Sequence, residues 1–169
     1  SGKNSRVDQC TNKGNITGER SIGGIVGTQS ENAFLTNSKN LGNVDGKKTL
    51  GGIVGAQSGM VSQCHNEGQI SGSEQIFGGI SGSTMETARI EKSDNSGRII
   101  GRSNNGGLVG SNRGTIIQSY NTGIVNGNMT FGGIAAWNYG TIQSCYHIGT
   151  LVSDGLKEDI RAGGIAGIN

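Results

Sequence analysis

The acidic side chains of this sequence are candidates for acid–base catalysis. Hydrolysis of a glycosidic bond needs two carboxylates about 5 to 9.5 Å apart, which one strand, or one column of equivalent positions in adjacent repeats, could supply. The 12 acidic residues form no such column. The column that contains Asp94, for example, reads Thr11, Lys39, His65, Asp94, Tyr120 and Tyr146. The HExxH, Gly-x-Ser-x-Gly and phosphate-loop patterns are also missing, so we expect no catalytic residue and no enzyme.

Three cysteines, an odd number, share one column of the same repeat. They are Cys10, Cys64 and Cys145, and the repeats between them have serine at this position. If repeats stack at the strand spacing of about 4.8 Å, the nearest two cysteines lie about 9.6 Å apart. A disulfide requires Cα atoms within about 7 Å. Because no clustered ligand spacing points to zinc either, we expect free thiols, no metal and no cofactor.

Aromatic side chains gather near the end of the chain and are the candidate ligand surface. Five of the seven lie between Tyr120 and Tyr146. Tyr120 and Tyr146 share a repeat column, so we expect them to stack about 5 Å apart on an outward face, with Trp137 and Tyr139 in the turn after a Gly-Gly strand. Such rings bind sugars or anchor a protein partner. In the alternative interpretation, the tyrosines cover coil edges and Trp137 fills a corner.

Charge and hydropathy exclude two classes of partner. Fourteen Lys and Arg residues against 12 acidic residues leave a net charge of +2, which provides no strong field for nucleic acid. No apolar run approaches the roughly 20 residues that a membrane helix needs, and the first 20 residues contain no apolar run of the kind that a secretory signal carries. We therefore expect neither nucleic-acid binding nor membrane insertion.

The elements that position these residues come from a repeat. A Gly-Gly-aliphatic block begins six times, at spacings of 28, 27, 28, 26 and 31 residues, at Gly23, Gly51, Gly78, Gly106, Gly132 and Gly163. Between these blocks runs a second block of the form small-x-Asn-x-Gly-x-aliphatic-x-Gly, and an aliphatic residue three positions before it marks a third. Each period thus contains three short β-like segments.

A chain of this composition can bury a core only by stacking its repeats. It has 33 glycines, no proline and 31% hydrophobic residues, so one repeat alone has too little apolar surface to fold. Stacked coils give every strand a neighbour and merge the aliphatic positions into one interior column. We predict an all-β fold, a single β-solenoid (parallel β-helix) over residues 1–169 with about six coils and three short strands per coil.

Asparagine and glycine columns mark one corner of each coil. The glycines follow the asparagines by two residues, where a tight corner requires a positive φ or a close backbone approach; they are Gly14, Gly42, Gly68, Gly97, Gly123 and Gly149. Two interpretations of the asparagines stay open: an inward ladder of hydrogen-bonded amides, or amides that each satisfy only their own turn. This column contains Asn12, Asn40, Asn66, Asn95 and Asn121, followed by His147.

The segment from Gly106 to Gly127 closely resembles the GLUG repeat, which is named for its Gly-Leu-x-Gly core, and Gly132 to Gly149 is a second good match. The first three repeats match more loosely, with Cys-Thr, Ser-Lys and Cys-His in place of Ser-Tyr. The resemblance implies a module of large bacterial surface or secreted proteins, including adhesins and immunoglobulin-A-cleaving metallopeptidases, and so an extracellular or cell-surface location. It implies no activity for the repeats themselves.

Three functions follow as hypotheses. The first is a non-catalytic adhesin stalk or ligand-presenting spacer with a host protein or glycan as partner. The second is an accessory module that docks the substrate of a secreted immunoglobulin-A-cleaving metallopeptidase. The third, and least favoured, is a carbohydrate-active β-helix enzyme. The sequence also stops within a repeat, so we expect a fragment of a longer repeat protein with uncapped ends that can associate end to end.

Overall fold

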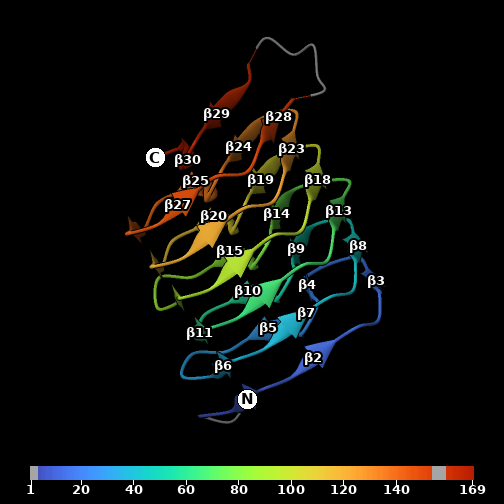
Figure 1. Ribbon diagram of the computed structural model, residues 1–169, viewed down its shortest axis with the longest axis vertical. Helices are drawn as coiled ribbons and strands as arrows, with labels where there is room; N and C mark the ends of the chain where they lie inside the picture. Colours follow the sequence, from blue (N-terminus) through green and yellow to red (C-terminus); the bar gives the residue numbers. More distant parts are fainter. Residues whose placement is uncertain (1–3, 154–158) are drawn as a thin grey trace.

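The computed structural model describes residues 4–153 and 159–169. Over these residues the chain forms thirty short strands and no helix. The strands make five parallel sheets of six strands each, which run along the length of the molecule (Figure 1). Each sheet takes one strand from every turn of the chain, so the protein is an all-β solenoid of about six coils and the predicted fold class is confirmed.

The first two sheets take the first two strands of each coil. The first sheet contains β1 (Arg6–Asp8), β6 (Phe34–Thr36), β11 (Met60–Ser62), β16 (Arg89–Glu91), β21 (Thr115–Ile117) and β26 (Thr141–Gln143). The second sheet contains β2 (Thr11–Asn12), β7 (Lys39–Asn40), β12 (His65–Asn66), β17 (Asp94–Asn95), β22 (Tyr120–Asn121) and β27 (Tyr146–His147). The second sheet carries the asparagine column, so its strands position these asparagines.

The remaining three sheets complete each coil. The third sheet contains β3 (Ile16–Gly18), β8 (Val44–Gly46), β13 (Ile70–Gly72), β18 (Ile99–Gly101), β23 (Val125–Gly127) and β28 (Leu151–Val152). The fourth contains β4 (Ile22–Gly23), β9 (Thr49–Gly51), β14 (Ile76–Gly78), β19 (Asn104–Gly106), β24 (Thr130–Gly132) and β29 (Arg161–Gly163). The fifth contains β5 (Val26–Gln29), β10 (Val54–Gln57), β15 (Ser81–Thr84), β20 (Val109–Asn112), β25 (Ala135–Asn138) and β30 (Ala166–Ile168).

The three β-segments that the sequence predicts for each coil are present. Two of them bend at a glycine and divide into two strands each. In the first coil, β2 and β3 lie on either side of Gly14, and β4 and β5 lie on either side of Gly24. A coil therefore contributes strands to five sheets because two of its three segments turn a corner.

The interior holds two hydrophobic clusters, and the expectation of one interior column is wrong. The first cluster lies between the first and fifth sheets and contains Leu35, Ile53, Val54, Val61, Cys64, Ile80, Ile90, Leu108, Val109, Ile116 and Ile134. The second lies between the third and fourth sheets and contains Ile22, Val44, Leu50, Ile70, Phe77, Ile99, Val125 and Phe131. Most of these side chains are fully buried, so each cluster is a continuous strip along the rod.

The asparagine column separates the two clusters. Asn66, on β12, is fully buried, and its side chain reaches the second glycine of a Gly-Gly pair across the interior. A Cβ atom on Gly52 would lie 2.3 Å from Cγ of Asn66 and 2.2 Å from the carbonyl oxygen of Gly79. In the first four pairs the second position is glycine because the amide side chain and the next coil already fill this space.

The glycine column after the asparagines has a related cause. No glycine of the described chain has a positive φ, so of the two expected reasons for glycine here, close backbone approach is the one that applies. A Cβ atom on Gly42 would lie 2.0 Å from the carbonyl oxygen of Gly14, and one on Gly68 would lie 1.9 Å from that of Gly42. Adjacent coils therefore touch backbone to backbone at this corner.

A different column adopts the left-handed conformation. It lies between the first and second sheets, immediately before the Cys/Ser column, and its φ angles are between 48° and 54°. Its members are Gln9, Asn37, Gln63, Lys92, Gln118 and Ser144. Since a side chain in this conformation costs roughly 1 to 2 kcal/mol, all six coils carry this strain at the same corner.

Gln118 offers a direct test of this corner because its side chain is exposed. We expect Gln118→Val to lower the free energy of unfolding by about 1 to 2 kcal/mol, because a β-branched residue tolerates φ near 49° poorly. Gln118→Gly relieves the strain but adds freedom to the unfolded chain, so the two effects offset to within about 1 kcal/mol. Urea denaturation followed by circular dichroism measures both variants. Equal stability of the valine and glycine variants would contradict the expectation.

Candidate ligand-binding surfaces

The asparagine column is an inward hydrogen-bonded ladder. Nδ2 of Asn40 donates to Oδ1 of Asn66 at 2.8 Å, and Nδ2 of Asn66 donates to Oδ1 of Asn95 at 2.7 Å. The same pattern joins Asn12 to Asn40 and Asn95 to Asn121. Each of these amides also donates to the carbonyl of the glycine two residues later, as from Asn40 to Gly42 at 2.8 Å. The ladder interpretation is therefore correct, and each amide satisfies its own turn as well, because one NH₂ group has two hydrogens.

A histidine ends this ladder in the sixth coil. Nδ1 of His147 lies 3.0 Å from Nδ2 of Asn121, which places the imidazole where the earlier coils have an amide. Burial lowers the pKa of His147, so the ring is favoured in its neutral form. A neutral ring can accept the hydrogen bond from Asn121.

A second amide column runs along the fifth sheet, and sequence reasoning missed it. Its residues are Gln29, Gln57, Thr84, Asn112, Asn138 and Asn169, each five positions after the second glycine of a pair. In the last coils it is also a ladder: Nδ2 of Asn112 donates to Oδ1 of Asn138 at 2.8 Å, and Nδ2 of Asn138 donates to Oδ1 of Asn169 at 2.7 Å. The constant offset from the Gly-Gly pair was a signal that could have revealed it.

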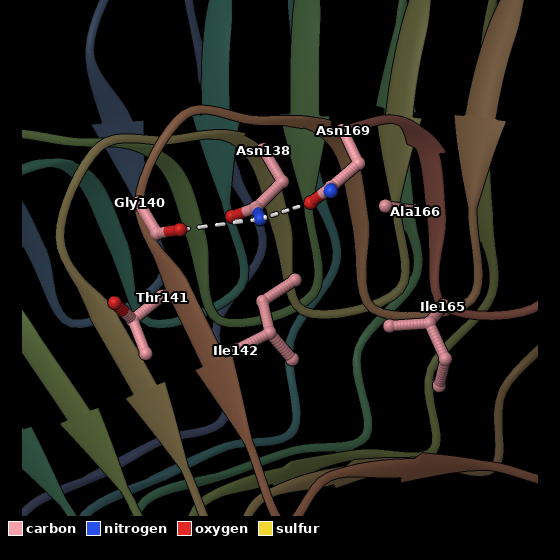
Figure 2. A pocket seen from close by; sticks show the side chains of 7 residues that line it. All are labelled: Asn138, Gly140, Thr141, Ile142, Ile165, Ala166 and Asn169. Carbon is pink, nitrogen blue, oxygen red and sulfur yellow. Dashed lines mark hydrogen bonds between the residues drawn. The ribbon is translucent and has the colours of Figure 1, made fainter.

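Figure 2 shows the hollow at the last coil, where this second ladder ends. The hollow has a volume of about 560 Å³ and is lined by Asn138, Gly140, Thr141, Ile142, Ile165, Ala166 and Asn169. Ile142 packs against the first hydrophobic cluster, so the apolar part of this lining is the interior strip itself, seen end-on. The strands of this coil stand at the end of every sheet. End-to-end association through this surface stays a prediction.

The Cys/Ser column is structural. Oγ of Ser38 accepts a hydrogen bond from the backbone N–H of Cys10, and Oγ of Ser93 accepts one from that of Cys64, both at 3.1 Å. The three thiols are free. Burial raises the pKa of Cys64 to about 11 and also raises that of Cys145. A thiol with a raised pKa is a poor nucleophile and a poor metal ligand near neutral pH.

The predicted stack of Tyr120 on Tyr146 is confirmed. The ring centroids are 4.9 Å apart and the ring planes differ by 2°. Both residues lie on the second sheet in register, with their side chains on the opposite face from the asparagine ladder. Tyr146 is 50% exposed, so one tyrosine face is open to a ligand. The negative charge of Asp94 and partial burial raise the pKa of Tyr120.

Charged side chains continue the outer face of the second sheet beyond Tyr120. His65 is bonded through Nδ1 to Asp94 and through Nε2 to Glu67 at 3.2 Å, and Lys39 pairs with Glu67 at 2.5 Å. The hydrogen bond that His65 donates to Asp94 is the main cause of a raised pKa at His65, and the hydrogen bond from Lys39 is the main cause of a lowered pKa at Glu67. Sequence reasoning placed Lys39, His65 and Asp94 in one column but did not foresee this network.

Trp137 and Tyr139 form the second aromatic pair. Trp137 is the third residue of β25, so its predicted place in a turn is wrong, whereas Tyr139 does follow the strand. Their centroids are 5.9 Å apart at an interplanar angle of 17°. Nε1 of Trp137 donates to Oδ1 of Asn104 at 2.8 Å, and the guanidinium carbon of Arg113 lies 5.7 Å from the centroid of Tyr139. The indole is thus fixed in orientation while Tyr139 stays 61% exposed.

The structure does not gather the four candidate aromatics into one surface. Tyr120 and Tyr146 project from the second sheet, whereas Trp137 belongs to the fifth sheet and Tyr139 to the corner after it. The asparagine ladder on the inner side of the second sheet faces the Gly-Gly corner that precedes the fifth sheet. The two pairs are therefore separate candidate surfaces.

Within residues 4–153 and 159–169, no group of three or more His, Cys, Asp or Glu side chains could hold a metal ion. In the same part of the chain no helix is long and apolar enough to cross a membrane. Comparison with protein-family models, with curated proteins and with solved structures gives no match.

Proposed function

We propose that this chain is a non-catalytic β-solenoid module of a bacterial cell-surface or secreted protein, where it serves as a stalk or spacer that presents ligand-binding side chains. Its stiffness supports the role of a spacer. One amide ladder, a second ladder in the last coils and two hydrophobic strips run parallel to the five sheets. Bending the rod would have to break hydrogen bonds and core contacts together, because adjacent coils share both.

The ionic network on the second sheet supports a non-catalytic role. Asp94 and Glu67 are the carboxylates that flank a common group, but that group is the imidazole of His65. The ring occupies the space in which a substrate bond would have to lie between a general acid and a second carboxylate. Glu67 is also engaged with a cation, because it contacts Lys39. Such a network stabilises an outer sheet face rather than reacting with a substrate.

The outward aromatic pairs support the presentation of a ligand, and they are the observation that carries the proposal. Both pairs consist of rings held in place by a neighbour, with Tyr146 and Tyr139 at least half exposed. A rigid exposed ring gives contact area at a small entropic cost on binding. Aromatic residues are accordingly enriched among the side chains that dominate binding energy.

A binding screen of glycans and immunoglobulins tests this function. The wild type is compared with Trp137→Ala and Tyr146→Ala, each checked by circular dichroism for retained fold. We expect a ligand from one of these two classes to bind the wild type, and one of the two variants to weaken binding by about tenfold or more, as expected for a central aromatic contact. Immunoglobulin binding would favour the substrate-docking module of a metallopeptidase. No ligand for the wild type, or equal binding by all three proteins, would refute the presenting role.

A further inference from the structure

The corner between the fifth and first sheets varies in length along the rod. The chain crosses it in four residues at 30–33 and 85–88, but in two residues at 58–59, 113–114 and 139–140. The long corners stand out on both sides of the short corner at 58–59. Between them lies a hollow of about 440 Å³, which we call the corner hollow. It is lined by Glu31, Ser58, Met85, Glu86, Thr87 and Arg113.

Charged side chains of both signs line the corner hollow without an ion-pair partner. Among the described residues, Glu31, Glu86 and Arg113 take part in none of the salt bridges, and all three side chains are exposed. Oγ1 of Thr87 donates to the carbonyl of Ser58 at 2.9 Å and lies 3.5 Å from a carboxylate oxygen of Glu31. The hollow thus offers a guanidinium donor and two carboxylate acceptors to a ligand.

An aromatic platform adjoins the corner hollow. Arg113 links the two, because its side chain lines the hollow and its guanidinium lies over the ring of Tyr139. Tyr139 is in turn stacked on Trp137, whose indole N–H is held by Asn104. The ring, the guanidinium and the carboxylates therefore occupy one continuous stretch of surface along the corners that follow the first to fifth coils.

We propose that the corner hollow and Tyr139 bind a neutral oligosaccharide, an assignment that rests on the proposed ligand-presenting function. The apolar C–H face of a pyranose packs against an aromatic ring. Sugar hydroxyls both donate and accept, so they satisfy Glu31, Glu86 and Arg113 together. An acidic peptide would be repelled by the two carboxylates. A neutral, hydroxyl-rich ligand matches both signs of charge and the ring.

The test uses a glycan array that carries neutral hexose and N-acetylhexosamine oligosaccharides beside sialylated and sulfated ones. The neutral oligosaccharide that binds best is then titrated against the protein, with Trp137, the sole tryptophan, as fluorescent reporter. We expect a saturable change of its emission. Tyr139→Ala, and separately Glu31→Gln combined with Glu86→Gln, should weaken binding at least about tenfold. Ile148→Ala, at an exposed side chain outside both aromatic pairs, should bind like the wild type.

Three results would overturn the assignment: binding of anionic glycans alone, no binding of neutral oligosaccharides, or wild-type affinity in the Tyr139→Ala variant. The proposed function is judged separately. If a glycan or immunoglobulin binds and Tyr146→Ala abolishes its binding, the module still presents a ligand but does so from the second sheet. If no glycan and no immunoglobulin binds at all, both proposals fail.

Discussion

Replacing Gly79 by alanine is expected to disrupt the middle of the solenoid. Its added Cβ would lie 2.3 Å from Cγ of Asn95 and 2.4 Å from the carbonyl oxygen of Gly107. Neither neighbour can move away easily. Asn95 is fully buried and bonded to the amides of the coils before and after it, and Gly107 belongs to the next Gly-Gly pair. We expect the free energy of unfolding to fall by about 3 kcal/mol or more, the upper part of the range for overpacked cores.

Gly164→Ala is the matched control for this prediction. Gly164 holds the same repeat position in the last coil, but a Cβ there would have no atom within 4 Å. Alanine also restricts the unfolded chain more than glycine does, so the control should keep wild-type stability or gain up to about 1 kcal/mol. Urea midpoints by far-ultraviolet circular dichroism compare the two variants. Similar midpoints for both would mean that the Gly-Gly pair is not required by close packing.

The sequence predicts a repeat column well where the same structural reason determines the residue type in successive coils. In the first four pairs the second glycine faces an amide of the opposite sheet, so no larger residue fits there, and the pair recurs with a clear period. The asparagine column and the stacked Tyr120 and Tyr146 could be predicted for the same reason, since residues in one column of a solenoid must lie one strand spacing apart. The in-register pairing of adjacent coils is sufficient to predict the contacts within these two columns.

Features that depend on how the coil bends could not be predicted in this way. The left-handed column contains Gln, Asn, Lys and Ser, which share no chemistry that would have identified it. The two hydrophobic strips were merged into one because the sequence does not show that Asn66 reaches the facing Gly52 and divides the interior. The corner hollow depends on the contact between Glu31 and Thr87, which lie two coils apart on either side of Ser58. Small differences in repeat length do not by themselves predict this contact.

Asn66→Ala should be as damaging as the change at Gly79, through loss of hydrogen bonds rather than collision. Asn66 is fully buried; it accepts from Asn40 and donates to Asn95 and to the carbonyl of Gly68. Its removal leaves buried polar groups of these neighbours unpaired, each at about 1 to 3 kcal/mol. We expect a total loss of roughly 3 to 5 kcal/mol. Asn12→Ala, at the partly exposed start of the ladder, should cost only about 1 kcal/mol.

Asn66→Asp separates the lost hydrogen bonds from lost volume, since the two side chains have nearly the same shape. An ionised carboxylate can still accept from Asn40 but faces Oδ1 of Asn95 with a second acceptor. The folded state therefore favours the protonated acid, which raises its pKa above the unfolded value of about 3.9. Relative to the wild type, this variant should be least destabilised below about pH 4 and should lose stability as the pH rises towards 7. A pH-independent difference from the wild type in urea denaturation would show that the amide ladder does not depend on the donor at residue 66.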